Sequence, residues 1–558
     1  MDGTGNLDAT LFPEPAGPGG ADSGDDRTRV FHAAHVLADG GARPTAFAVA
    51  HDVVVAVGDS AELRSRFPDG DHVDLGGALV TPGFNDAHCH PSVTAENRLR
   101  LDVSAGVVDS LADIKARLSG LAATTAPGEW VIAAGYDPAR TEPGQRLDRW
   151  SLDEISRTQP VAVIVFNWHI AVVNSAALEA IGYDRDTRDP VGGELGRAVD
   201  GELDGWLYEQ AFLLPFWAGT GRAPWVREPD LPALVDALVE ENEYLHSLGI
   251  TSYCDAIVTP NVWGVYAQAR AEGRLTPRVG MLLWYTYFET ARELGITAGF
   301  GDDRLRYVGI KTMHDGAISG GTCLCRQPYA SATGKDNGIQ LVDDGEFDDL
   351  VERVHAAGDR ICVHANGDLA IQKVLDAVEA AQRKHPHQRR INHRIEHASM
   401  ADRELMGRIR AAGVTPVPFG GLMRQYGDQV TRFYGLEQAE RTLPHRSFLE
   451  EGIPVAGSSD YPVTPPSPLV AMQSMTTRTT VNGNLLGGDQ RIDVRDALAI
   501  YTRGSAHATG ESGRKGRLVP GQLADFVVLD TDITAAPERI GETRVLSTWV
   551  GGQQVWAG

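Results

Sequence analysis

Histidine, lysine and aspartate residues follow short apolar segments at several places along the chain. The first are His88 and His90, at the end of the apolar segment 79–87. Side chains two residues apart on a strand point the same way, so two imidazoles could bind one metal ion. Each residue alone is explained as well by a structural or solvated side chain, but the whole set favours a site for two divalent cations. The predicted metal ligands are His88, His90, Lys311, His364, His397 and Asp460.

Such a site needs a fold that brings the ends of distant strands together. Short apolar segments alternate with helical stretches through the middle of the chain, which is typical of parallel β/α units. Eight units close a (β/α)8 barrel, and active sites in these barrels lie at the carboxyl ends of the strands. The sequence therefore predicts an α/β protein built on a TIM barrel. The expected strands are 79–87, 250–255, 278–285, 307–313, 361–364, 392–397, 414–419 and 453–459.

The rest of the chain predicts additional parts around the barrel. Both terminal regions contain short strands and turns, so we expect them to form one small β-sandwich. The interval between the first two expected strands is far longer than one β/α unit needs, which predicts an inserted cap subdomain over the barrel mouth. The predicted organisation is a flexible leader (1–27), a β-sandwich from 28–78 and 511–558, a barrel from 79–92 and 235–510, and a cap from 93–234.

Composition limits the possible partners. The 558 residues carry a formal net charge of −24, which argues against binding to nucleic acid or to anionic membranes. No segment has the length of a transmembrane span. Five cysteines, an odd number, imply no disulfide framework and favour a reducing, cytoplasmic location. Cys323 and Cys325 could bind a soft metal, but no second pair completes such a site, so buried thiols are the preferred interpretation.

The order of the predicted ligands resembles a known family. His-x-His on the first strand, Lys on the fourth, His on the fifth and sixth, and Asp on the eighth resemble the amidohydrolase superfamily. The closest similarity is to its YtcJ-like branch, which includes N-substituted formamide deformylases, and it extends from about Arg29 to the C-terminus. The segments that carry the resemblance are 82–88, 168–178, 311–316, 364–368, 394–398 and 516–530.

The resemblance implies a particular use of Lys311. An ammonium group would repel a cation, but a neutral amine can take up CO2 to give a carbamate that bridges two metal ions. We therefore expect two divalent metals, most simply zinc, with iron or manganese as alternatives. A plain Lys311 beside a single metal remains the other interpretation.

The chemistry expected at this site is hydrolysis of a C–N bond in a non-peptide amide, an N-substituted formamide or another N-acyl amine, by a metal-activated hydroxide. Asp460 is expected to take the proton and deliver it to the leaving nitrogen. His169, from the predicted cap, is a candidate donor to the developing oxyanion, and His314 is a further catalytic candidate. Aromatic residues that could line an apolar pocket, or equally belong to the core, are Trp168, Trp284, Tyr285, Tyr329, Phe419 and Tyr461.

Three alternatives remain open from the sequence. A mononuclear deaminase could use the same barrel, and so could a cyclic amide or lactone hydrolase, because the same hydroxide would attack either substrate. A catalytically silent barrel that binds a ligand is an alternative of another class. Dimerisation is expected only by analogy with other barrels. In each case the predicted partner is a small molecule, amide-like in the preferred interpretation.

Overall fold

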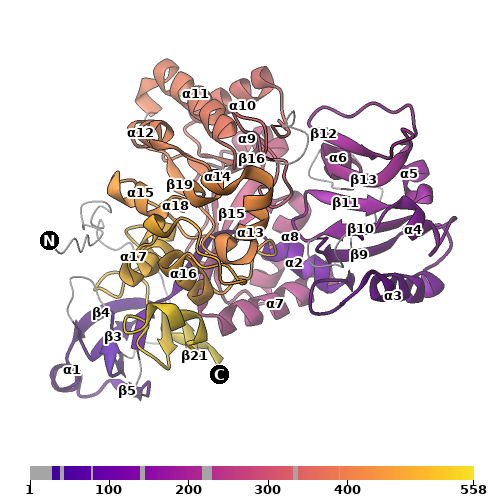
Figure 1. The fold of residues 1–558 in the computed structure, drawn as a ribbon. Helices are drawn as coiled ribbons and strands as arrows, with labels where there is room; N and C mark the ends of the chain where they lie inside the picture. Colours follow the sequence, from indigo (N-terminus) through magenta and orange to yellow (C-terminus); the bar gives the residue numbers. More distant parts are fainter. Residues whose placement is uncertain are drawn as a thin grey trace.

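The computed structural model describes residues 28–37, 43–76, 79–138, 145–216, 229–330, 337–388 and 390–558. Within these residues a central barrel carries additional sheets at opposite ends of the molecule (Figure 1), which confirms the predicted fold class. The predicted leader, 1–27, lies outside the described residues.

The barrel wall contains seven named parallel strands in the order β19-β18-β17-β16-β15-β14-β7. These strands are β7 (Phe84–Cys89), β14 (Ile250–Val258), β15 (Arg278–Trp284), β16 (Leu305–Met313), β17 (Ile361–Ala365), β18 (Arg394–His397) and β19 (Thr415–Val417). The helices around the wall are α7 (Leu231–Ser247), α8 (Pro260–Ala271), α9 (Phe288–Glu293), α10 (Asp344–Ala356), α11 (Asp368–Lys384), α12 (Arg403–Ala412), α13 (Leu422–Tyr434), α14 (Leu436–Arg441), α15 (His445–Glu450), α16 (Pro468–Thr477), α17 (Val494–Ala499) and α18 (Ser505–Ala508). Their apolar faces pack on the strands, as α11 shows with buried residues at helical spacing: Ile371, Val374, Leu375 and Val378.

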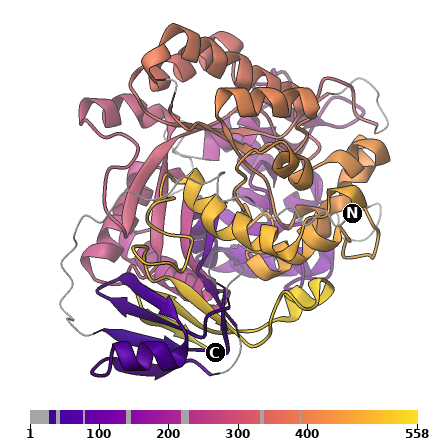
Figure 2. The ribbon, with the colours of Figure 1, turned by 90° about the vertical axis from the view of Figure 1, so that its left-hand side faces the viewer.

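Two sheets built from both ends of the chain pack against each other below the barrel (Figure 2). One has the order β4-β3-β1-β5 and the other β2-β6-β20-β21-β22. Their inner faces share an aromatic core, in which the rings of Phe31 and Phe526 lie 5.0 Å apart. The elements are β1 (Arg29–His32), β2 (His35–Val36), β3 (Ala46–Ala50), β4 (Val53–Gly58), α1 (Ser60–Arg66), β5 (Asp71–Asp74), β6 (Leu79–Pro82), β20 (Phe526–Leu529), β21 (Val545–Val550) and β22 (Gln553–Ala557).

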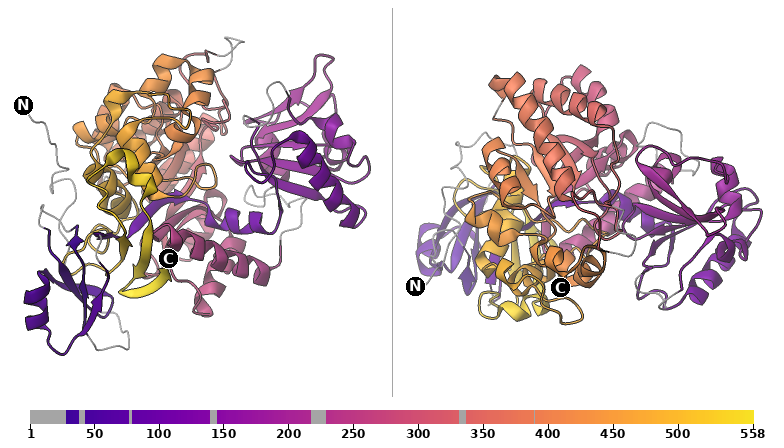
Figure 3. Two further views of the ribbon diagram at one scale, coloured as in Figure 1. Left: turned by 60° about the horizontal axis from the view of Figure 1, so that its bottom comes forward. Right: turned by 45° about the horizontal axis from the view of Figure 1, so that its top comes forward.

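The segment inserted between β7 and β14 forms a separate sheet with the order β12-β13-β11-β10-β9-β8. This cap sheet lies beside the barrel, on the side away from the N-terminal sheet (Figure 3). Its elements are α2 (Pro91–Arg98), β8 (Leu101–Asp102), α3 (Leu111–Thr124), β9 (Val131–Tyr136), α4 (Arg149–Asp153), β10 (Val161–Val165), β11 (Ile170–Val173), α5 (Ser175–Ile181), β12 (Gly193–Arg197), β13 (Leu203–Glu209) and α6 (Gln210–Phe216).

The eighth expected strand, 453–459, closes the barrel without forming a named strand. On one side Phe419 and Ser458 form a parallel bridge, and on the other Ala87 N donates to Gly457 O at 2.9 Å. Pro454 has no amide hydrogen and therefore cannot donate to a ladder, which shortens the pairing. The few remaining contacts still bring residue 460 next to the end of β7.

The first expected strand is divided at Gly83. β6 pairs with β20 in the terminal sheet, whereas β7 belongs to the barrel. Gly83 N donates to Asp525 O at 2.9 Å, so the chain leaves the terminal sheet at this point. A Cβ on Gly83 would lie 2.2 Å from Thr251 Oγ1, so only glycine allows the chain to cross this close to β14.

Candidate metal centre and cavity

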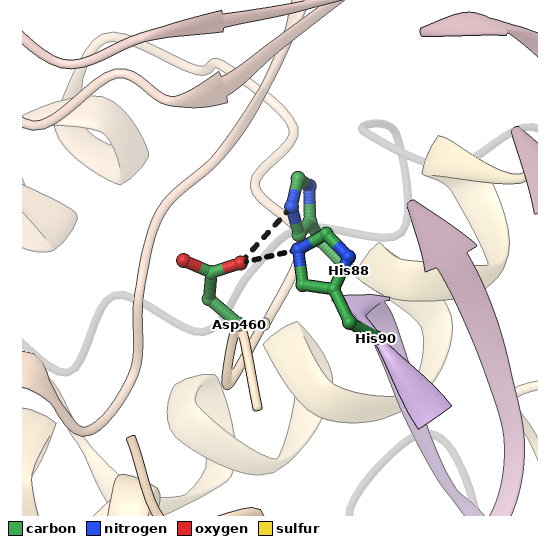
Figure 4. Close-up of side chains that lie close together, drawn as sticks. All are labelled: His88, His90 and Asp460. Carbon is green, nitrogen blue, oxygen red and sulfur yellow. Dashed lines mark hydrogen bonds and ion pairs between the residues drawn. The ribbon is translucent and has the colours of Figure 1, made fainter. Parts of the chain in front are cut away.

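His88 and His90 meet Asp460 at the carboxyl end of the barrel (Figure 4). Asp460 Oδ1 lies 3.2 Å from His88 Nε2 and 3.0 Å from His90 Nε2. The ligand atoms of the three residues all lie within 4.8 Å of one another. Burial raises the pKa of the Asp460 carboxyl, but the neighbouring histidines outweigh it and hold that pKa well below its usual value. Asp460 is therefore an anion that faces two imidazoles.

Glu396 supports His88 from inside the barrel. The fully buried Glu396 carboxylate accepts a short hydrogen bond from His88 Nδ1. Arg394 donates to the same carboxylate through Nε, at 2.8 Å, and through Nη2, at 2.7 Å. Burial raises the pKa of Glu396, but Arg394, His88 and Lys311 together outweigh burial and the net shift is strongly downward. With Nδ1 held by an ionised carboxylate, His88 presents Nε2 to the site.

The contact between Glu396 and His88 could not be predicted from strand periodicity. Neighbours on a strand normally point to opposite faces, so Glu396 should point away if His397 points inward. His397 has a φ of 71° and Ala398 one of 44°, so the strand pattern ends there and both side chains reach the barrel interior. No signal in a single sequence marks this change of backbone.

His364 and His397 form a second pair beside the first. His364 Nδ1 lies 3.0 Å from His397 Nε2, and the ring of His397 stacks on Phe419 at 4.3 Å. The His88 and His397 rings are 4.8 Å apart, so the two pairs adjoin. Burial holds the pKa values of His364 and His397 well below their ordinary value, so both imidazoles are neutral bases able to bind a cation.

Lys311 contributes the one amine among the predicted ligands. It lies on β16, lines the same cavity as His88 and His364, and is 1% exposed. It makes no hydrogen bond or ion pair with any residue that the structure describes. Burial lowers the pKa of its ammonium group, while Glu396 and Asp460 oppose this shift. The net shift of the Lys311 pKa is downward.

Asp86 connects the two ends of the barrel wall at this site. Its Oδ1 accepts a hydrogen bond from His88 N at 3.1 Å, and its carboxylate accepts others from Ser459 N, at 3.2 Å, and from Ser459 Oγ. Burial raises the pKa of Asp86 to about 6. The same side chain thus positions the backbone of β7 next to the segment that carries Asp460.

His169 reaches the site from the cap. It lines the cavity, and its ring centroid lies 5.2 Å from that of His364. The fully buried Glu209 accepts a hydrogen bond from His169 Nδ1 at 2.6 Å. Burial lowers the pKa of His169, but Glu209 raises it by more, so the net shift is upward. Sequence analysis missed Glu209 because a residue 40 positions away carries no signal of this contact.

His314 is the predicted site residue that the structure does not bring into the cavity. Side chains alternate along β16, so Lys311 and Met313 line the cavity while His314 points outward. Its ring packs edge-on against Phe347 of α10 at 4.7 Å, and both ring nitrogens lack a partner among the described residues. Burial lowers its pKa to about 4. The parity of β16 was the sequence signal that placed His314 on the outer face.

The rest of the cavity lining is largely apolar. Of the six aromatic residues considered from sequence, Trp168 lines this cavity and the other five are absent from its described lining. Trp284 and Tyr285 instead line a separate cavity beside α9. The apolar residues that do face the ligands include Val93, Trp168, Phe212, Leu213, Phe216, Leu234, Ile257, Val262 and Val265.

Left-handed backbone conformations gather at this site. Non-glycine residues with positive φ include Trp168 (59°), Glu209 (51°), His397 (71°) and Asp460 (54°). Such conformations cost roughly 1–3 kcal/mol each and persist only where the surrounding structure holds them. Their concentration around one cavity is a further reason to treat it as the candidate functional site.

Known proteins with similar sequences show which family this chain belongs to. A model of the Amidohydrolase family matches residues 71–556. The chain belongs to the amidohydrolase family. The resemblance inferred from the sequence motifs is thereby confirmed, and so is the expectation that the protein is a metal-dependent amidohydrolase.

Individual relatives of this amidohydrolase cover nearly its whole length. It is 28% identical over 529 residues to a Bacillus subtilis (strain 168) protein named "Putative amidohydrolase YtcJ", covering 94% of this chain and 98% of that protein. It is 29% identical over 518 residues to the N-substituted formamide deformylase of Arthrobacter pascens, covering 89% and 92%. Protein LONG AFTER FAR-RED 3 of Arabidopsis thaliana is 26% identical, covering 91% and 88%.

Solved structures share the fold of this amidohydrolase. An uncharacterized metal-dependent hydrolase from Pyrococcus horikoshii OT3 superposes with a TM-score of 0.72 at 22% identity, covering 92% of this chain and 99% of that one. A second, from Pyrococcus furiosus, gives a TM-score of 0.69 at 23% identity, covering 91% of this chain and 100% of that one.

Among the described helices of this chain, none has the length and apolar character required to cross a bilayer.

The donor atoms of the amidohydrolase fit a divalent metal. His88 Nε2 is buried and makes no hydrogen bond of suitable geometry, although Asp460 Oδ1 lies 3.2 Å away. Buried polar atoms are normally satisfied, so a cation between these groups explains the arrangement. Imidazole and carboxylate ligands suit zinc and also accept iron or manganese. The structure thus contains a candidate His–His–Asp metal site at the end of the barrel.

Proposed function

We propose that this amidohydrolase cleaves the C–N bond of a non-peptide amide, with an N-substituted formamide or another N-acyl amine as its substrate. The observation that carries the proposal is the convergence of His88, His90 and Asp460 on a cavity whose remaining lining is largely apolar. The 29% identity to an N-substituted formamide deformylase supports the same substrate class.

We propose two divalent cations, most simply zinc, held by the predicted ligands. His88, His90 and Asp460 would bind one, and His364 with His397 would bind the other. Carboxylation of Lys311 by CO2 would supply a ligand shared between them, which agrees with a buried amine that has no partner among the described residues. Metal ions in such a site supply Lewis-acid polarisation and lower the pKa of water.

The roles of the surrounding residues follow from their positions. Asp460 Oδ1 lies between two imidazoles and is held ionised, so it can accept a proton and return it to the leaving nitrogen. His169 lines the cavity from the cap side, where a donor can stabilise negative charge on the substrate oxygen. The apolar wall formed by Phe212 and Phe216 would bind an apolar substituent and exclude water.

Elemental analysis tests the metal site first. Protein purified without chelator and with bicarbonate present should contain about two equivalents of zinc, iron or manganese per chain. One equivalent would contradict the binuclear site. No metal, together with no activity after metal addition, would contradict the hydrolase proposal.

An amide panel tests the substrate class. Formamides with benzyl or alkyl groups on nitrogen should be hydrolysed faster than unsubstituted formamide, because the cap wall is apolar. Release of formate and amine in equal amounts is the direct measurement. Turnover confined to esters, or to ring-amino groups of heterocycles, would contradict the proposed amide chemistry.

A further inference from the structure

Glu209 connects three parts of the molecule at one buried point. It is the last residue of β13 in the cap sheet, it is fully buried, and it holds a φ of 51°. We infer that Glu209 is a positioning residue for His169: it fixes which imidazole nitrogen faces the cavity and fixes that nitrogen relative to the barrel. This inference rests on the proposed amide hydrolysis only for the role of His169, not for the arrangement itself.

The side chain and the main chain of Glu209 both bind His169. Glu209 Oε2 accepts from His169 Nδ1 at 2.6 Å, and Glu209 N donates to His169 O at 2.7 Å. With Nδ1 occupied, Nε2 is the nitrogen that remains to act in the cavity that His169 lines. The side-chain bond holds the imidazole ring and the main-chain bond holds the backbone that carries it. Together they leave the ring little freedom to rotate or to exchange its nitrogens.

The other carboxylate oxygen binds the loop that follows β16. Glu209 Oε1 accepts from Thr322 Oγ1 at 2.6 Å and from Ala317 N at 3.3 Å. Gly316 has no room for a side chain here, because a Cβ would lie 2.5 Å from Glu209 Oε1. A carboxylate has acceptors on both oxygens and no donor, so it can receive all three of these bonds at once. A glutamine has only one acceptor oxygen. Its NH2 group would therefore face either the His169 Nδ1 donor or the donors of Thr322 and Ala317.

The loop that Glu209 binds is itself fixed to the barrel. Tyr434 donates through its hydroxyl to Ile318 O at 3.0 Å, and Gln429 Nε2 donates to Ser319 O at 2.7 Å, both from α13. The loop is therefore held in place by the barrel and gives Glu209 a fixed partner outside the cap. Glu209 therefore holds His169 in a fixed position relative to the barrel end that carries the predicted metal ligands.

A double-mutant cycle distinguishes this positioning role from a general structural link. Glu209→Gln should lower kcat roughly 10–100-fold while KM changes less than about threefold, because the transition-state donor is misplaced. In a His169→Asn background the same substitution should cost no more than about twofold in kcat. An equal loss in both backgrounds would overturn the inference, as would an unchanged kcat in a folded Glu209→Gln protein.

Glu202→Gln is the matched control on the same hairpin. Glu202 pairs with Arg185 at 3.1 Å in the turn before β13, at the opposite end of the strand from Glu209, and is partly exposed. The Glu202→Gln substitution should leave kcat and KM within about twofold of the parent values. A loss equal to that of Glu209→Gln would show that any change in this hairpin disturbs the site, and would overturn the inference.

NMR of protein with isotope-labelled histidine nitrogens tests the arrangement without substrate or turnover. His169 should carry a proton on Nδ1 whatever the protonation of Nε2, which also holds a proton when it acts as a donor. The His169 resonance is assigned by its loss in His169→Asn. Glu209→Gln should change the protonation pattern of this ring. A wild-type His169 with unprotonated Nδ1 would overturn the inference even if the variant failed to fold. If no amide is hydrolysed but Nδ1 is protonated, the proposed function fails while the arrangement stands.

Discussion

The two walls of the cavity differ in how they are built. The barrel wall presents imidazole, amine and carboxylate groups, and buried ion pairs such as Arg394–Glu396 hold them from behind. The cap wall presents apolar side chains such as Phe212 and Phe216, which are held by packing within the cap. The barrel wall is thus organised for charge and the cap wall for exclusion of water.

This difference predicts that reaction and specificity depend largely on different segments of chain, although Ile257 of β14 and Val262 and Val265 of α8 also belong to the apolar lining. Substitutions in the barrel wall should alter metal binding and kcat, and substitutions in the cap wall should alter KM. His169 is an exception, since it belongs to the cap and lies beside His364 of the barrel wall. The following predictions test this separation, from the largest expected effect to the smallest.

Asp460→Asn should have the largest effect. An amide cannot accept the proton that the ionised carboxylate accepts, so we expect kcat to fall roughly a thousandfold. Metal content should remain at more than half the parent value, because four histidines are unchanged. Asp184→Asn, at an exposed turn of the cap, serves as the control for general effects of removing a carboxylate. Retention of a tenth or more of the activity would exclude the role given to Asp460.

Glu396→Gln should weaken the barrel wall without touching the cap. Arg394 would be left buried without a compensating charge, which costs roughly 3–5 kcal/mol of folding stability. Loss of the partner of His88 should also lower metal affinity roughly 10–100-fold. Denaturant unfolding and competition with a chelator measure the two effects.

Glu511→Gln is the matched control for this substitution. Its carboxylate pairs with Lys515 at 2.9 Å, with both side chains about 5% exposed or less, far from the predicted ligands in sequence. It should lower stability but leave metal affinity unchanged. Equal losses of metal affinity in both variants would show that stability alone, and not the contact with His88, controls metal binding.

Phe216→Ala should affect the cap wall selectively. Removing this ring from the apolar lining should raise KM for an N-benzyl amide roughly tenfold and change kcat less than about threefold. The KM for unsubstituted formamide should stay the same, because that substrate does not reach the cap wall. Phe300→Ala, at a residue that is 55% exposed, is the control. An equal rise in KM for both substrates would break the proposed division between the walls.

His314→Phe should have the smallest effect on activity. His314 points away from the cavity, so kcat/KM should stay within about twofold of the parent value. Stability should rise by about 1 kcal/mol, because two buried ring nitrogens without partners among the described residues are removed. Thermal unfolding and steady-state kinetics measure both. A tenfold loss of kcat/KM would restore His314 as a catalytic candidate.

Strand periodicity was sufficient to predict part of the site. His88 in β7 and His90 directly after it both line the cavity, and Lys311 lines it from β16, as an alternating pattern predicts. The alternation of apolar segments with helical stretches was enough to predict the barrel. These features depend on local geometry and on a regular topology, both of which are visible in one sequence.

The contacts that support these residues could not be predicted in the same way. Glu396 and its neighbour His397 both reach the barrel interior because His397 takes a left-handed conformation. Glu209 reaches His169 only because β13 and β11 pair in a particular register. Both depend on long-range packing, which leaves no periodic signal. His314 differs from these residues, because strand parity from Lys311 and Met313 already places it on the outer face.

The division of the first expected strand at Gly83 bears on how the chain matures during synthesis. β6, directly before the strand that carries His88, is paired along one edge by β20 near the C-terminus. At roughly 5–20 residues per second, a ribosome needs on the order of a minute to travel from β6 to β20. Throughout that interval the nascent polypeptide carries its histidine pair on a strand whose anchor has not yet been translated. The candidate metal site therefore gains the complete anchor of its first strand only after nearly the entire message has been read.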